Sequence, residues 1–171
     1  MPAFLTSAGS LSEQTSLTLS SAAAVIVILV TPCVGALSDR VGRMPVLAGL
    51  SIANMLLPIT MFSLMASGSH GNALAGALVL AALAGGVSAV GAVATAEQFP
   101  GEGRVTGLAL GATGATAIFG GLTPFLAQYL VQRTGLAIAP GVMIAAVSLA
   151  VLPLFLTMKE TAPNLPGAKK I

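Results

Sequence analysis

GALSDRVGRMP, at residues 35–45, is the stretch of this sequence that decides its fold. The stretch places one acid, two arginines and two glycines between two long apolar runs. Gly42 permits a sharp reversal of the backbone, and Asp39 can pair with an arginine or cap the helix that follows. Pro45 fits the first turn of a helix, where the N–H that proline lacks would have no partner. The stretch therefore predicts the tight turn of a two-helix hairpin.

The apolar runs beside this turn, and three others, are long enough to cross a lipid bilayer. The hydrocarbon core is about 30 Å thick, which takes about 20 mostly apolar residues in a helix. Apolar residues make up 56% of the 171 residues and charged ones only 7%, against about a quarter in soluble domains. We therefore predict an all-α membrane protein with five transmembrane helices, near residues 17–37, 44–66, 73–95, 105–130 and 138–158.

The basic residues fall mostly on one side of the membrane if successive spans alternate in direction. Cytoplasmic loops carry an excess of Lys and Arg, so the side with six of the seven basic residues is predicted to be cytoplasmic. The amino terminus then lies outside, and the carboxyl terminus inside, a cell (inner) membrane that the chain crosses several times. Arg133 lies on the outer side, and the six others are Arg40, Arg43, Arg104, Lys159, Lys169 and Lys170.

Local signals predict how these helices end and pack. Gly135 follows the fourth span and is expected to end it in a left-handed conformation. Gly107 and Gly111 stand four residues apart, a spacing that predicts a closely packed neighbouring helix. Residues 1–158 are expected to form the transmembrane unit, and residues 159–171 a free polar tail in the cytoplasm.

Two motifs resemble elements of the major facilitator superfamily. Residues 35–43 fill every specified position of its G-x-L-x-D-R-x-G-R loop, which lies between helices two and three and recurs between helices eight and nine. EQFP at 97–100 and RVTG at 104–107 resemble the E-x-F-P…R-x-x-G element between helices ten and eleven. The resemblance implies the carboxyl-terminal half of a twelve-helix transporter. The five spans would be helices 8–12, and residues 2–5 the outer end of helix seven.

Two further segments resemble one branch of that family, the metabolite:proton symporters, which move shikimate, α-ketoglutarate, citrate, or proline and betaine. The segments are FGGLTP at 119–124 and KETAP at 159–163. The resemblance implies proton-coupled transport of a small polar metabolite, an organic acid or a compatible solute, by alternating access. Sugar porters share the E-x-F-P…R element but usually end with P-E-T-K-G, so a sugar-porter half is the alternative within the family.

The resemblance also implies which residues act. A cytoplasmic gating motif is expected to comprise Gly35, Asp39, Arg40, Gly42, Arg43, Glu97 and Arg104. In this family helices eight, ten and eleven contribute to the wall of the substrate cavity, so hydroxyl-bearing residues of those spans are candidate substrate contacts. They are Thr31, Ser88, Thr113 and Thr116. For each of them the alternative is that the hydroxyl bonds a carbonyl of its own helix and has no role in binding.

Nothing in the sequence indicates a cofactor, a metal site or an enzyme's set of reactive side chains, and no basic run could follow a nucleic-acid backbone. The expected partners are the lipid bilayer, a small-molecule substrate, protons and the amino-terminal half. No ionisable residue lies near the centre of a span, so the proton-binding groups are expected in that other half. Without it this chain should not transport. The competing hypothesis is a non-transporting small membrane protein or an inert fragment.

Overall fold

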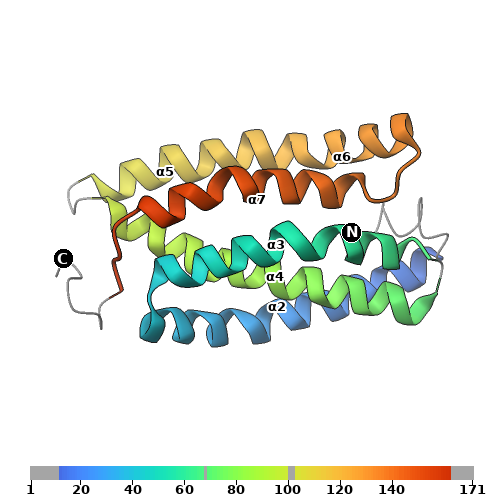
Figure 1. The fold of residues 1–171 in the computed structure, drawn as a ribbon, viewed down its shortest axis with the longest axis horizontal. Coiled ribbons are helices and arrows are strands. Elements are labelled where there is room, and N and C mark those ends of the chain that lie inside the picture. Colours follow the sequence, from blue (N-terminus) through green and yellow to red (C-terminus); the bar gives the residue numbers. More distant parts are fainter. Residues whose placement is uncertain (1–11, 68, 100–102, 163–171) are drawn as a thin grey trace.

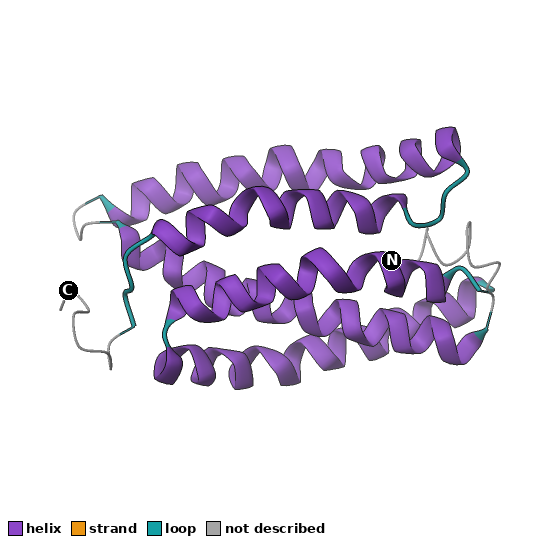
Figure 2. Ribbon diagram, in the orientation of Figure 1, coloured by secondary structure: helices purple, strands orange, loops and turns teal. Residues whose placement is uncertain are grey.

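The computed structural model describes residues 12–67, 69–99 and 103–162, which are almost entirely helical and contain no strand (Figure 1). Five helices in this part are long and apolar enough to cross a membrane, which confirms the predicted all-α membrane fold. Short loops join them (Figure 2). The elements are α2 (Glu13–Val41), α3 (Arg43–Met65), α4 (His70–Gln98), α5 (Arg104–Ala115), the π-helical turn η1 (Thr116–Gly120), α6 (Gly121–Thr134) and α7 (Ala139–Thr157).

The turn between the first two spans is shorter than predicted. Because α2 continues to Val41 and α3 begins at Arg43, Gly42 alone separates the two helices, and the expected break over residues 38–43 is wrong. Gly42 has φ 121° and ψ 149°, a backbone conformation that glycine adopts readily and other residues do not. Its N–H donates to the Ser38 carbonyl at 3.0 Å and closes the last turn of α2. One glycine therefore reverses the chain, as the sequence predicted.

The helices form a bundle in which α3 and α4 lie centrally (Figure 1). α3 packs against α4 and α7, and α4 packs in turn against α2. The fourth span, made of α5, η1 and α6, contacts α7 and α4, but no described side chain between residues 105 and 134 is buried. That span therefore presents most of its surface away from the other described helices. One buried cluster comprises Leu19, Phe62, Met65, Ala73 and Leu80, and another comprises Met44, Leu47, Val90 and Ala94.

The predicted close packing of a neighbouring helix at Gly107 and Gly111 is not seen within the described part of the chain. A Cβ added at Gly107 would lie 2.5 Å from the ring of Phe99, so the absence of a side chain there makes room for that ring. At Gly111 no other atom of the described chain lies within 4 Å of such a Cβ. The two glycines therefore do not form one packing step. Gly135 ends α6 with φ 68°, as predicted.

One end of the bundle gathers segments that are far apart in the sequence. The α2–α3 turn, the end of α4 and the chain that leaves α7 all lie there, at the left in Figure 1. Arg40, Arg43 and Lys159 belong to these segments, whereas Arg133 lies in the last turn of α6 at the other end. The basic residues of the described part are thus separated as the sequence predicted.

Candidate functional site

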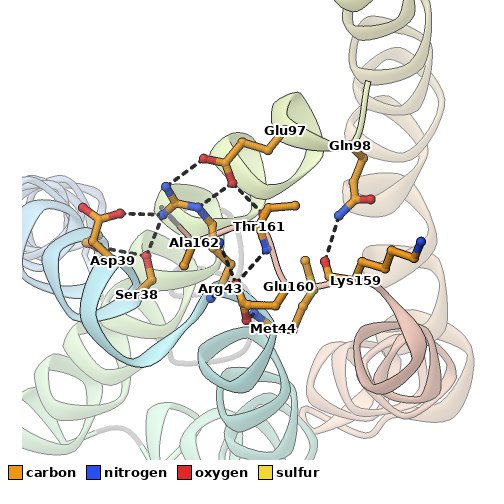
Figure 3. A network of polar contacts seen from close by, with 11 residues as sticks. Ser38, Asp39, Arg43, Met44, Glu97, Gln98, Lys159, Glu160, Thr161 and Ala162 are labelled. Carbon is orange, nitrogen blue, oxygen red and sulfur yellow. Dashed lines mark hydrogen bonds and ion pairs between the residues drawn. The ribbon is translucent and has the colours of Figure 1, made fainter. Parts of the chain in front are cut away.

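Arg43, the first residue of α3, lies at the centre of a polar cluster at this end of the bundle (Figure 3). Its guanidinium donates two hydrogen bonds to Glu97 on α4, from Nε to Oε2 at 2.7 Å and from Nη2 to Oε1 at 2.9 Å. Nη1 donates to the Asp39 carboxylate at 2.8 Å and to the Ser38 hydroxyl at 3.0 Å. One buried arginine therefore joins the end of α2, the start of α3 and the end of α4.

The two acids that face Arg43 differ in their surroundings. The side chain of Arg43 is 7% exposed and that of Glu97 18%, whereas that of Asp39 is 47% exposed. A two-point contact between arginine and a carboxylate fixes both groups geometrically, and shielding from water strengthens it. Ion pairs in contact with solvent contribute little. We conclude that Glu97 is the principal partner of Arg43.

A third acid, Glu160, binds the amino-terminal end of α3. Its carboxylate accepts hydrogen bonds from the backbone N–H groups of Arg43 at 2.8 Å and Met44 at 3.0 Å. Gly42, the residue before the helix, has no side chain that could do this. The first N–H groups of a helix have no partner within it, and the helix dipole favours a negative charge beside them. Glu160 therefore caps α3 from 117 residues further along the chain.

The segment after α7 is held in the same cluster. The backbone N–H groups of Thr161 and Ala162 each donate to Glu160 at 2.9 Å. The Thr161 hydroxyl donates to Glu97 at 2.6 Å, and the Gln98 amide donates to the Lys159 carbonyl at 3.3 Å. The prediction of a free tail is therefore wrong for residues 159–162, because polar groups of this segment form hydrogen bonds with one another and with the ends of α3 and α4. Residues 163–171 lie outside the described part.

The electrostatics of Glu160 follow from these contacts. Burial by itself would raise the pKa of this carboxyl, because it disfavours the charged form. Four backbone N–H groups, those of Arg43, Ala162, Met44 and Thr161, donate to the carboxylate and lower its pKa, and their effect prevails. The folded structure therefore favours ionised Glu160, the form that caps a helix.

The structure brings together part of the predicted gating motif. Asp39, Gly42, Arg43 and Glu97 meet as described above. Arg40 is exposed, and its side chain has no hydrogen bond within the described part of the chain. No other described atom lies within 4 Å of a Cβ added at Gly35, so no close neighbour explains that glycine. Arg104 begins α5, and its side chain lies outside what the structure describes.

Three members of the cluster were missed by the sequence analysis: Ser38, Glu160 and Thr161. Ser38 occupies an unspecified position of the first motif, and Glu160 and Thr161 belong to the KETAP segment, whose resemblance indicates a branch of the family. The sequence signal for Glu160 and Thr161 was their position directly after the last span, on the side where the basic residues gather. We call the set of Ser38, Asp39, Arg43, Glu97, Glu160 and Thr161 the Arg43 cluster.

The four candidate substrate contacts are not equivalent. Thr31 donates to the Val27 carbonyl of its own helix at 2.7 Å, as the alternative interpretation has it. Ser88 is exposed on α4. Thr113 and Thr116 are exposed and line one open hollow together on the fourth span. The hollow is lined by Ala112, Thr113, Thr116 and Ala117.

Comparison with known proteins identifies the family. The chain is 36% identical over 163 residues to the ectoine/proline transporter ProP of Corynebacterium glutamicum, covering 91% of this chain and 32% of that one. It is 34% identical over 169 residues to the proline/betaine transporter of Escherichia coli, covering 98% and 34%. It is 34% identical over 111 residues to the citrate-proton symporter of Klebsiella pneumoniae, covering 64% and 25%.

The chain thus spans about a third of the length of the first two of these relatives. No solved structure matches it. The family model of the Major Facilitator Superfamily matches residues 1–171, the whole chain. With five membrane-spanning helices, two motifs of the family's type and relatives that are all transporters, this chain belongs to the Major Facilitator Superfamily.

Proposed function

We propose that this chain is the carboxyl-terminal half of a proton-coupled transporter that moves a small polar solute by alternating access. The relatives are named as transporters of ectoine, proline or betaine, or as symporters of citrate and protons. Transporters of this family consist of two six-helix halves that move against each other around a central site. The amino-terminal half is therefore a required partner, and this chain alone is inactive.

The Arg43 cluster carries this proposal. It joins α2, α3, α4 and the segment after α7 at one end of the bundle through a buried arginine and three carboxylates. A transporter that alternates between two states needs groups that stabilise one state and separate in the other. We propose that the cluster lies on the cytoplasmic side, where basic residues accumulate, and that its contacts stabilise the outward-open state.

Among the candidate solutes we favour a net-neutral compatible solute such as proline or betaine. Matches to proline or betaine transporters extend over 91% and 98% of the chain, and the match to a citrate symporter over 64%. In the described spans the charged side chains lie only near helix ends. A net anion such as citrate needs opposite charges beside it in the membrane, and these spans supply none at their centres.

Uptake by cells that lack their own osmolyte transporters tests the proposal. Three strains are compared: one expresses this chain alone, one the amino-terminal half alone, and one both halves. Entry of radiolabelled proline, betaine and citrate is measured in each with and without a proton gradient. Proline or betaine should enter only when both halves are present and faster with the gradient. If both halves reach the membrane and none of the three solutes enters, the proposed transport of such a solute is overturned.

A further inference from the structure

The fourth span is irregular where its surface is hollowed. The hollow is lined by Ala112, Thr113, Thr116 and Ala117, positions that lie on one face of a helix. The π-helical turn η1 begins at Thr116, and Pro124, inside α6, cannot donate a backbone hydrogen bond. π-helical turns within α-helices occur frequently at functional sites. The hollow therefore coincides with the place where this helix departs from regular geometry.

The two hydroxyls in the hollow are not used by their own helix. A threonine in a helix usually donates to a carbonyl one turn earlier. In this chain Thr31 does so at 2.7 Å and Thr134 at 2.7 Å. The hydroxyls of Thr113 and Thr116 make no hydrogen bond within the described part of the chain, and both side chains are exposed. Two hydroxyl donors are thus available in the hollow, whose other lining residues are alanines.

We propose that Thr113 and Thr116 donate hydrogen bonds to the carboxylate of a small zwitterionic solute. Ala112 and Ala117 would contact its apolar carbons. An O–H group without an acceptor needs one, and a carboxylate is the acceptor that such a solute carries, whereas a quaternary ammonium has no lone pair to offer. Hydrogen bonds to an ionised acceptor are also the stronger ones. This inference rests on the proposed function, and it identifies the carboxylate as the group of the solute that this half binds.

The charge of the span supports a net-neutral ligand. Between residues 105 and 132 the sequence has no ionisable side chain other than Tyr129, and Arg133 lies at the end of α6. Burying an uncompensated charge is far more costly than burying a hydrogen-bonded polar group. A hydroxyl pair can therefore receive one carboxylate whose charge is balanced within the solute, and it is poorly suited to a tricarboxylate.

The test compares proline with its carboxamide, which keeps the ring and the amine and loses the carboxylate charge. In the transporter made of both halves, the Thr113→Val and Thr116→Val variants keep the shape of the side chain and remove the donor. Each should raise the KM for proline about tenfold, with little change in kcat. The KM for prolinamide should change less than twofold. Thr60→Val is the control, because that hydroxyl donates to the Leu57 carbonyl at 2.8 Å.

A second measurement covers variants that fold poorly. Cys33 is the one cysteine of the chain, so a Cys33→Ser, Ala117→Cys variant of this chain carries its single thiol in the hollow and keeps both threonines. Proline should slow its alkylation, and prolinamide should not. An unchanged preference for proline over prolinamide in both valine variants, or alkylation that proline does not slow, overturns the inference. If the unmodified transporter takes up no zwitterion, the proposed function fails as well. Failure of the inference alone is therefore distinguished from failure of the proposed function.

Discussion

Replacing Glu97 with glutamine should destabilise the folded chain by about 2–3 kcal/mol. Glutamine has nearly the shape of glutamate but offers one oxygen and no charge. Arg43, 7% exposed, would keep one of its two hydrogen bonds to position 97 and lose its principal counter-charge. Removing one partner of a buried ion pair costs about 3–5 kcal/mol. The loss is smaller here because Asp39 remains 2.8 Å from the guanidinium.

The matched control is Asp39→Asn, in the same cluster. Asp39 makes one ion-pair contact with Arg43 and its side chain is 47% exposed, so its replacement should cost about 0.5 kcal/mol. The free energy of unfolding is measured in detergent micelles by titration with dodecyl sulfate, followed by circular dichroism. Equal losses for the two variants, or a loss below about 0.5 kcal/mol for Glu97→Gln, would refute the assignment of Glu97 as the principal partner.

Three further predictions concern stability and use the same titration. Gly42→Ala should cost about 1–3 kcal/mol, because alanine is strained at φ 121°; an unchanged midpoint would contradict this. Gly141→Ala should cost about 1–3 kcal/mol, since its Cβ would lie 2.8 Å from the Pro58 carbonyl oxygen. Gly111→Ala should cost nothing, because no atom of the described residues lies within 4 Å of its Cβ, and similar losses for both variants would contradict this packing argument. Glu160→Gln should destabilise the folded chain at neutral pH. Because the pKa of Glu160 is lowered in the folded state, its ionised carboxylate contributes fully to stability above the ordinary glutamate pKa of about 4.3. That contribution is lost as the pH falls through the lowered value, so the difference between Glu160→Gln and the unmodified chain should shrink below about pH 4, and a constant difference from pH 3 to 7 would exclude this role.

The spans and the first turn could be predicted from the sequence because their causes are local. A bilayer sets the length of an apolar run, and Gly42 stands at the point where the chain must reverse. The pairing of Arg43 with Glu97 was also accessible, since the two motifs resemble elements of one family. The extents of the helices were less predictable, because polar residues such as Ser38, Asp39 and Arg40 continue α2 at the end of the bundle.

The role of the segment after α7 could not be predicted, because it depends on tertiary packing. Glu160 reaches the amino-terminal end of α3 only because α7 packs along α3 and ends beside it. The same holds for the hydroxyls: Thr31 and Thr116 are the same residue type in apolar spans, and only the structure shows that one of them bonds its own helix.

The most direct test of the account is uptake of betaine by the transporter made of both halves, with Arg43→Gln compared with Arg133→Gln. Arg43 contacts Ser38, Asp39 and Glu97, whereas Arg133 lies at the opposite end over the Tyr129 ring. Arg43→Gln should reduce uptake at least tenfold at equal amounts in the membrane, and Arg133→Gln less than twofold. Equal uptake by the Arg43→Gln variant and the unmodified transporter would contradict the proposal that the Arg43 cluster controls the transport cycle.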